Sequence, residues 1–373
     1  MKRIYCDYAA TTPVDERVLE AMLPCFREFY GNASSIHAFG VRAKRLLDTA
    51  REQVAQVIGA EAHEIVFTSG GTEANNLALQ GFAYASQSAG EILVSAVEHP
   101  SVRQTCMHLQ QQGWKITRLP ADTEGRIAPE TVQAAISPET RLISIMAVNN
   151  EVGTINPIAE IAALAAEKGI ALHTDAVQAF GKIPIDVKTM PVTLLSLSGH
   201  KIYGPKGAGA LYIRRGTRLD KILFGGRQEH DLRAGTENIP AIVGLGMAAE
   251  LMSAHGQEEQ QRLALLAEDL LEGLQKQAGA QLNGPVEGRL PQILNLSFPG
   301  KDSLSLAMAL DLRGIAVSIG SACSSGTVQP SHVLKAMRVP DSLQKSALRF
   351  SLGRSTTKQD IRAVVAAVTE VVR

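Results

Sequence analysis

The 373-residue sequence lacks an excess of charge of either sign, because 37 Lys and Arg residues balance 37 Asp and Glu residues. A chain with no net charge has no general electrostatic attraction to nucleic acid or to an anionic membrane. We therefore expect neither a direct nucleic-acid partner nor a membrane partner. The length allows two or three domains and excludes a single small core.

Long apolar runs and closely spaced cysteines are also missing. The N-terminus, "MKRIYCDYAATTPVDE", lacks the apolar segment of a signal peptide, and no later run reaches the roughly 18 apolar residues of a membrane helix. The four cysteines, Cys6, Cys25, Cys106 and Cys323, form no C-x-x-C pair, which argues against a disulfide framework and a zinc site. We expect a cytoplasmic protein with free thiols and no resident metal.

Helical stretches alternate with short apolar runs between about residues 41 and 215. The helical stretches include residues 41–59 and 157–169, and the runs are residues 64–68, 91–97, 141–148, 170–176 and 192–198. Runs that are apolar on both faces, separated by helices, indicate a largely parallel sheet covered by helices. The predicted fold class is therefore α/β.

The pattern changes after about residue 256. A charged helical stretch at 258–277 precedes shorter strands at 292–298 and 347–353 and a last helix at 357–373. We expect a large α/β domain over residues 15–255. A smaller α+β domain would comprise residues 1–14 and 256–373 and carry the Cys323 segment.

Polar residues follow each predicted strand, where open α/β sheets bind ligands. Gly70, Gly71 and Thr72 form either a phosphate-binding helix start that Thr72 caps or an ordinary tight turn. His99 is either structural or catalytic.

The next two strand ends leave similar alternatives. Asn149 and Asn150 are turn formers or ligand contacts. Asp175, with Gln178 three residues later, holds a cationic ring nitrogen or a metal, or it caps a helix.

Lys201 follows an apolar strand and a Ser-Gly-His turn. At the floor of a cleft, desolvation would lower its pKa and make the amine a nucleophile for Schiff-base chemistry. The alternative is a surface lysine that extends to water. A phosphate turn, a histidine, an acid at a strand end and a later lysine are together the parts that hold pyridoxal phosphate.

Cys323 lies in "SIGSACSSG", among small residues and not in the apolar run that is usual for a core cysteine. The composition favours a mobile loop.

Ten motifs follow one another along the chain: "DYAATTPVD", "GNASSIH", "FTSGGTEANN", "EHPS", "VNNEVG", "HTDAVQAFGK", "SGHKIYGPKG", "RAGTEN", "GSACSSG" and "RFSLGR". With them the chain resembles, nearly end to end, the cysteine desulfurases of the NifS and IscS type in the class V aminotransferase group. The resemblance implies the pyridoxal phosphate-dependent fold type I, with a mostly parallel seven-stranded sheet and a smaller α+β domain.

The resemblance also implies roles for the matching residues. Lys201 would form the Schiff base and move the substrate α-proton, His99 would stack on the cofactor ring and assist proton transfer, and Asp175 and Gln178 would contact the ring nitrogen and ring oxygen. The phosphate would be held by Gly71, Thr72, Ser198, His200 and, from the other subunit of a homodimer, Thr236. The substrate would be held by Asn150 and by Arg349, which would bind its carboxylate.

Cys323 matches the nucleophile that takes sulfur from L-cysteine as a persulfide and leaves alanine. The acceptor would be a protein such as an iron-sulfur scaffold or a tRNA thiolation enzyme, and Cys323 would be at most a transient ligand of an iron-sulfur cluster. Ile319, Cys6 and the end of the chain at Arg373 depart from common family members. We expect these departures to affect the choice of partner and not catalysis.

Three alternative functions remain to be weighed. An aminotransferase would have no use for the thiol of Cys323, whereas a selenocysteine lyase would use the same residues. A cofactor-free nucleotide-binding or scaffold protein would leave Lys201 and Asp175 without a purpose.

Overall fold

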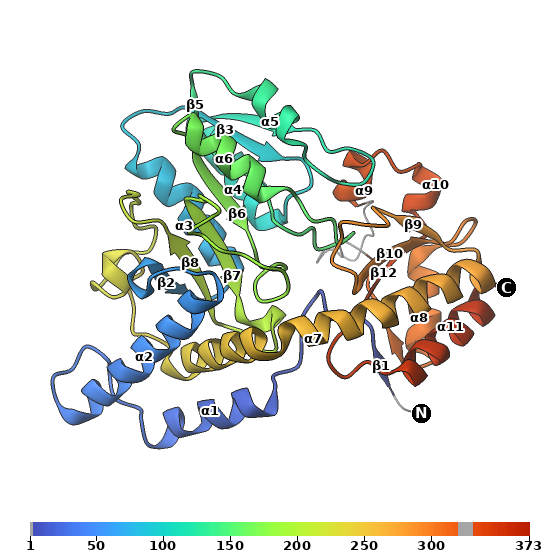
Figure 1. Ribbon diagram of the computed structural model, residues 1–373, viewed down its shortest axis with the longest axis horizontal. Helices are drawn as coiled ribbons and strands as arrows, with labels where there is room; N and C mark the ends of the chain where they lie inside the picture. Colours follow the sequence, from blue (N-terminus) through green and yellow to red (C-terminus); the bar gives the residue numbers. More distant parts are fainter. Residues whose placement is uncertain (1–2, 320–330) are drawn as a thin grey trace.

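The largest element of the fold is a seven-stranded sheet, seen in a computed structural model that describes residues 3–319 and 331–373 (Figure 1). In spatial order its strands are β2 (Ile65–Thr68), β8 (Gly209–Ile213), β7 (Leu194–Ser198), β6 (Ala171–Asp175), β5 (Thr140–Ser144), β3 (Glu91–Ser95) and β4 (Lys115–Leu119). Only β8 runs antiparallel to its neighbours, β2 and β7. The mostly parallel sheet is therefore confirmed, and each of the five predicted runs overlaps one of its strands.

Helices cover both faces of this sheet. The helices of this part of the chain are α1 (Glu16–Arg27), α2 (Ala38–Val57), α3 (Gly71–Ala85), α4 (Pro100–Gln111), α5 (Pro129–Ala135), α6 (Ile158–Glu167) and α7 (Ile239–Ala278). On β3, Leu93 belongs to an apolar cluster with residues of α2, α6 and α7, whereas its neighbours Ile92 and Val94 belong to a cluster with residues of α3 and α4. Burial on both faces explains why the strands lack polar alternation.

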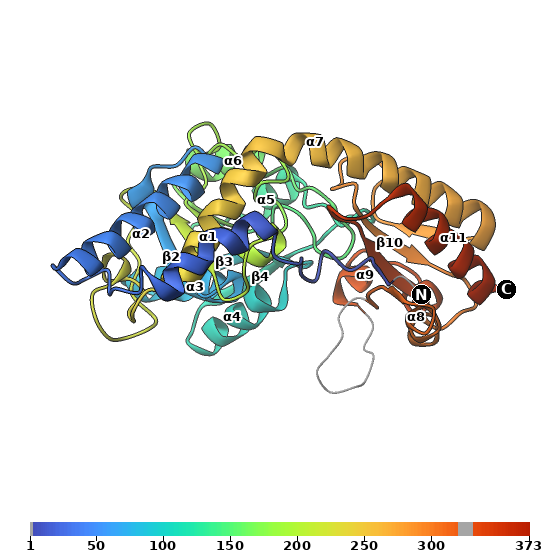
Figure 2. The same ribbon diagram turned by 90° about the horizontal axis from the view of Figure 1, so that it is seen from below.

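Helix α7 is a single 40-residue element, whereas the sequence predicted a helix only from residue 258. Its N-terminal half contacts α1 and α2, and its C-terminal half contacts α11 (Lys358–Val372). Figure 2 shows it running from the sheet to the other end of the molecule. The N-terminal half was missed because its own residues are mostly small or apolar and are buried on all sides of the helix. Such a helix shows no amphipathic pattern in the sequence.

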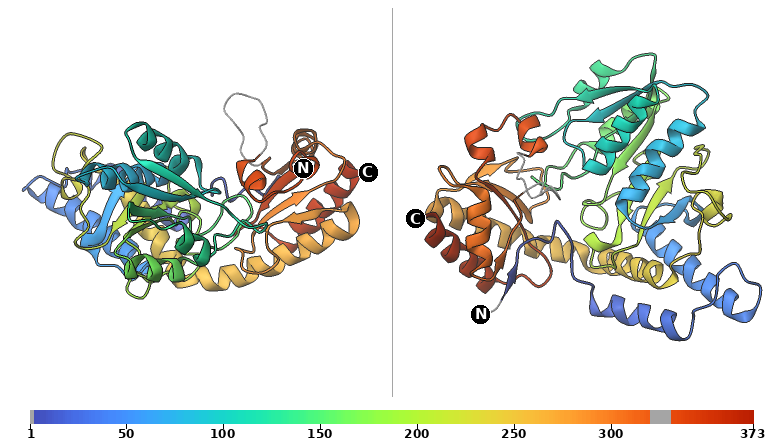
Figure 3. Two further views of the ribbon diagram at one scale, coloured as in Figure 1. Left: turned by 90° about the horizontal axis from the view of Figure 1, so that it is seen from above. Right: turned by 180° about the vertical axis from the view of Figure 1, so that it is seen from behind.

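The C-terminal unit is built on a smaller antiparallel sheet. Its strands are β12 (Ala347–Ser351), β10 (Ile293–Ser297) and β9 (Gln281–Asn283), with α8 (Ser303–Asp311) and α11 beside them. Near the N-terminus, β1 (Ile4–Tyr5) pairs in parallel with β11 (Ile315–Ala316), so both ends of the chain lie on this unit (Figure 3). Two short helices, α9 (His332–Ala336) and α10 (Asp341–Gln344), precede β12 in the chain. Residues of both helices line a cavity together with residues of α4.

Cys6, Cys25 and Cys106 are buried free thiols. Burial raises the pKa of the Cys6 thiol to about 12. Cys6 therefore stays uncharged and packs as a small apolar residue in the core of the C-terminal unit. Within the described ranges, no helix has the combination of length and apolar character that crossing a membrane requires.

Candidate active site

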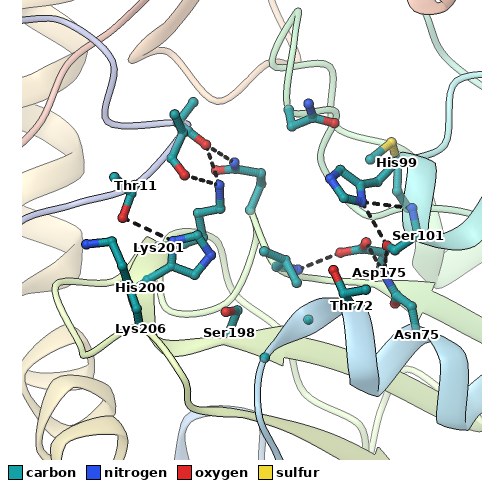
Figure 4. Close-up of a pocket in the computed structure, with 18 of the residues that line it drawn as sticks. Thr11, Thr72, Asn75, His99, Ser101, Asp175, Ser198, His200, Lys201 and Lys206 are labelled. Carbon is teal, nitrogen blue, oxygen red and sulfur yellow. Dashed lines mark hydrogen bonds between the residues drawn. The ribbon is translucent and has the colours of Figure 1, made fainter. Parts of the chain in front are cut away.

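A cavity of about 680 Å³ opens at the carboxyl ends of the parallel strands and brings together most of the predicted site residues (Figure 4). Those that line it are Gly71, Thr72, His99, Asn150, Asp175, Gln178, Ser198, His200, Lys201 and Arg349. Thr236 is exposed and does not line it, and Cys323 lies outside the described residues. We call this space the catalytic cavity.

Lys201 ends a short 3-10 turn, Gly199–Lys201, directly after β7. Its Nζ donates to the carbonyl oxygens of Ala9 at 2.6 Å and Ala10 at 2.7 Å. Burial, with further contributions from the charges of Lys182 and Arg349, lowers the pKa of Lys201 to about 7. The alternative of a surface lysine is therefore wrong, and a large share of this amine is uncharged at neutral pH.

Asp175 closes β6 and points into the catalytic cavity. Its Oδ2 accepts a hydrogen bond from Asn75 Nδ2 at 2.7 Å, and its Oδ1 accepts one from the Val177 amide at 3.0 Å. The carboxylate thus fixes a turn and also presents negative charge to the cavity. Within residues 3–319 and 331–373, no group of three His, Cys, Asp or Glu side chains is arranged to hold a metal ion.

His99 is the N-cap of α4 and lines the cavity at the same time. Its Nδ1 accepts from the Ser101 amide at 3.2 Å and lies 2.7 Å from Ser101 Oγ. An Nδ1 that accepts an amide N–H leaves the proton of the neutral ring on Nε2. Burial lowers the pKa of His99, and Lys201 adds to this effect while Asp175 opposes it.

The start of α3 forms the part of the cavity expected to hold a phosphate. The helix begins at Gly71 with Gly70 as its N-cap, so the expectation that Thr72 caps it is wrong. A Cβ on Gly71 would lie 2.6 Å from Val177 Cγ2 and 3.6 Å from Ser198 Cβ, which shows how closely these segments approach. Ser198 Oγ is buried and has no hydrogen-bond partner among the described residues.

Cationic and hydroxyl groups complete this region. His200 Nδ1 lies 3.2 Å from Thr11 Oγ1, and Lys206 lines the same wall. An unpaired buried hydroxyl beside open helix amides and a lysine fits a phosphate group. The residues present therefore fit pyridoxal phosphate, whose phosphate would meet this wall and whose ring nitrogen would meet Asp175.

The two asparagines after β5 have different roles. Asn149 is buried, and its Oδ1 accepts from the amides of Glu151 and Val152, so it forms the turn. Asn150 lines the cavity, and its carbonyl oxygen accepts from Arg349 Nη1 at 2.9 Å.

Arg349 lies at the centre of β12 and is almost fully buried. Its Nη2 lies 2.8 Å from Asp7 Oδ1, while its Nε is buried and has no hydrogen-bond partner among the described residues. The guanidinium is thus held in place through Nη1 and Nη2, while its Nε–H has no partner among the described residues. A carboxylate in the cavity would suit that donor.

The sequence analysis missed several residues of the site: Asp7, Thr11, Asn75, Glu98, Ser101 and Lys206. Asn75 lies one helical turn after Gly71, so helical periodicity could have identified it. Glu98 is fully buried, accepts from the Met146 amide at 2.7 Å, and has its pKa raised well above the usual range by burial and by Asp175. No local pattern distinguishes it from an exposed glutamate.

The described residues on either side of the Cys323 segment lie beside the cavity. The backbone of Ser318 pairs with that of Arg349, at N···O distances of 2.7 and 3.1 Å. At the other side, Ser331 Oγ donates to Glu151, which follows Asn150.

Comparisons with known proteins agree on one family. The profile of the family described as "Aminotransferase class-V" matches residues 4–364. "Cysteine desulfurase IscS" of Methanosarcina thermophila is 48% identical over 373 residues, covering 100% of this chain and 92% of the relative. The protein of the same name from Dictyoglomus turgidum is 48% identical, covering 97% of this chain and 92% of the relative.

Solved structures give the same result. One described as "NIFS-LIKE PROTEIN" superposes with a TM-score of 0.94 at 37% identity, covering 99% of each chain. Another, "SspA in complex with cysteine", has a TM-score of 0.86 at 38% identity and covers 95% of this chain and 100% of its own.

Proposed function

The chain belongs to the aminotransferase class-V family and is a pyridoxal phosphate-dependent cysteine desulfurase, and from that premise we propose how its residues divide the work. The observation that carries the proposal is the arrangement of Lys201, Asp175 and the unpaired Ser198 hydroxyl around one cavity. These groups suit, in turn, the aldehyde, the ring nitrogen and the phosphate of the cofactor.

Backbone amides and polar side chains would hold the cofactor. The amides of Gly71 and Thr72 at the start of α3, with Ser198 and His200, would bind the phosphate, while Asp175 would meet the ring nitrogen and Gln178 the ring oxygen. Asn75 keeps the Asp175 carboxylate in place through the bond from its Nδ2. When bound, pyridoxal phosphate supplies an electron sink that stabilises negative charge on the substrate α-carbon.

Lys201 acts both as the covalent anchor and as the base. Its pKa of about 7 leaves much of the amine uncharged at neutral pH, and an uncharged nitrogen can take a proton from the substrate α-carbon. His99 holds a proton on Nε2, because Nδ1 is committed to the start of α4. His99 lines the cavity, so it would lie beside the cofactor ring and could donate this Nε2 proton.

The substrate is L-cysteine, and Arg349 orients it. The free Nε and the Nη groups of Arg349 bind its carboxylate, with Asn150 alongside. This contact would hold the substrate in one orientation within the cavity.

Cys323 accepts the sulfur. Its thiolate attacks the substrate sulfur, the carbon–sulfur bond breaks, and the carbon takes up protons, so that L-cysteine and one thiol become alanine and Cys323 persulfide. Cys323 is the fifth residue after Ser318, which pairs with Arg349, and an extended chain spans about 3.3 to 3.6 Å per residue. This length of chain is enough for the thiol to reach the cavity.

Assembly and acceptor follow from the same premise. We infer a homodimer in which Thr236 contributes to the phosphate site of the other subunit, and its exposure outside its own cavity supports this. The persulfide passes to a protein acceptor, either an iron-sulfur scaffold or a tRNA thiolation enzyme.

We infer that the chain divides into a large domain, residues 15–255, and a smaller domain, residues 1–14 and 256–373. The pairing of β1 with β11 supports this division, because it joins the N-terminal strand to the C-terminal unit.

The experiment that tests the proposal measures alanine release from L-cysteine in the presence of a reductant. Cys323→Ala should bind the cofactor with an unchanged visible spectrum and release almost no alanine. The matched control is Cys25→Ala, which removes a buried thiol of α1 and should keep most of the activity. Full turnover by Cys323→Ala would contradict the proposal.

A further inference from the structure

A second cavity, of about 690 Å³, lies between the sheet and the short helices α9 and α10. It shares no lining residue with the catalytic cavity. One wall contains Arg103 of α4 and Arg118 of β4, and the other contains Lys335 of α9 and Lys345, which follows α10. We call this space the cationic cavity.

The positive charges of the cationic cavity are not compensated. Asp341 is the one carboxylate among its lining residues, and its side chain interacts only weakly, at 3.4 Å, with Gln344 Nε2. Within residues 3–319 and 331–373, no side chain forms a hydrogen bond or an ion pair with any of the four cationic groups. In a chain with no net charge, such a concentration of unpaired cations is a local feature and not a consequence of composition.

The two arginines also lie close enough to oppose each other. Burial and the charge of Arg118 lower the pKa of Arg103, and only the buried Glu151 opposes this effect. Burial and Arg103 together lower the pKa of His332, at the cavity edge, to about 4, although the bond of its ring to the Glu98 carbonyl works in the other direction. An oxyanion between these groups would remove the repulsion and use the guanidinium donors in pairs.

We propose that the cationic cavity binds a small molecule that carries at least two oxyanion groups, phosphates or carboxylates. One group would meet the forked donors of Arg103 and Arg118, and the other would meet the point charges of Lys335 and Lys345. The volume lies in the range of small-molecule sites, about 300 to 1,000 Å³. A cavity of this size with four cations suits such a ligand better than a nucleic acid, which needs a continuous basic surface.

Calorimetric titration of the holoenzyme tests the proposal independently of the catalytic assignment. The enzyme is saturated with pyridoxal phosphate, so that the phosphate region of the catalytic cavity is filled, and is titrated with pyrophosphate or with citrate at constant ionic strength. We expect one molecule bound per chain. A preference for pyrophosphate would identify the ligand as a phosphate compound, and a preference for citrate would identify it as a carboxylate; either result supports the site.

Charge-removing variants locate the binding. Arg103→Gln with Arg118→Gln should weaken binding at least about tenfold, since charge-assisted hydrogen bonds are lost. Lys335→Gln with Lys345→Gln, at exposed positions that should not affect folding, should also weaken it. The matched control, Lys188→Gln with Arg362→Gln, removes the same charge outside the cavity and should leave binding unchanged.

Three results would overturn the proposal. One is the absence of binding by either probe at millimolar concentration, and another is an equal loss of affinity in the control variant. The third is unchanged affinity in the lysine variant, which would show that no ligand bridges the two walls.

Discussion

The two sides of the catalytic cavity differ in how far the protein itself satisfies their polar groups (Figure 4). On the aspartate side, formed by Asn75, His99, Ser101 and Asp175, hydrogen bonds of 2.7 to 3.2 Å link these residues into one network. On the lysine side, formed by Ser198, His200, Lys201 and Lys206, Ser198 Oγ has no partner within the described ranges, and Lys201 Nζ donates to two backbone carbonyl oxygens. The hydrogen bonds of the aspartate side are therefore already formed without a ligand, whereas the lysine side has polar groups that the cofactor and the substrate would pair.

The largest effect should come from Lys201→Ala on the lysine side. It removes the covalent anchor and the base together, so kcat should fall at least about 10⁴-fold. The absorption band of the bound cofactor should be lost, which is measured in the visible spectrum of the purified variant. The control, Lys206→Ala, removes a charge from the same wall of the cavity and should retain the absorption band. If kcat of Lys201→Ala were similar to kcat of Lys206→Ala, the assignment of Lys201 would be contradicted.

Asp175→Asn tests the aspartate side with almost no change of shape. The amide cannot stabilise a protonated ring nitrogen, so kcat should fall on the order of 10²–10³-fold while the cofactor still binds. Asp186→Asn makes the same chemical change at an exposed position and should leave kcat unchanged. If Asp175→Asn kept more than half of the wild-type kcat, the electrostatic role of this side would be wrong.

Ser198→Ala sharpens the comparison, because this hydroxyl has no partner until the phosphate arrives. The apoprotein should be no less stable than the wild type, while cofactor affinity should fall about tenfold. Ser196→Ala is the matched control two residues earlier on β7, where the hydroxyl bonds to His173 Nε2 at 3.1 Å. It should cost about 1 kcal/mol of unfolding free energy and leave cofactor affinity unchanged. Thermal unfolding of both apoproteins and cofactor titration separate the two cases, and the reverse pattern would contradict the account.

The smallest expected effect concerns Lys182, which acts on Lys201 from behind the lysine side. Its Nζ donates to Gln178 Oε1 at 3.2 Å, and Gln178 Nε2 and Lys201 Nζ both bond to the Ala9 carbonyl. Lys182→Met removes a positive charge that lowers the pKa of Lys201, so this pKa should rise from about 7. Less of the amine would then be uncharged at pH 7, and capture of the cofactor by the apoprotein should slow about twofold.

The rate of capture as a function of pH checks this prediction. The half-maximal rate should move to higher pH in Lys182→Met, while Lys188→Met, at an exposed position, should match the wild type. An unchanged profile in Lys182→Met would show that the charge of Lys182 does not act on Lys201, and a shift to lower pH would contradict the sign of the effect.

The sequence predicted the sheet and the charged residues Asp175 and Lys201 of the site, but it did not predict the residues that hold the site residues in place. Strand ends marked by Asp175 and Lys201 were visible because each follows an apolar run, and the sheet places the ends of parallel strands along one edge. Asp7 and Glu98 were missed, because their roles depend on contacts with Arg349 and Met146, which are distant in sequence. The N-terminal half of α7 was missed because its burial on all sides removes the helical pattern.

The central claim is that sulfur passes from L-cysteine to Cys323, and one measurement tests it most directly. Holoenzyme is mixed with L-cysteine without a reductant and stopped after a single turnover, and alanine is counted while mass spectrometry locates any added sulfur. The account predicts one alanine per chain and the mass of one extra sulfur atom on Cys323, with none on Cys6, Cys25 or Cys106. Alanine formed without added sulfur on Cys323 would contradict it.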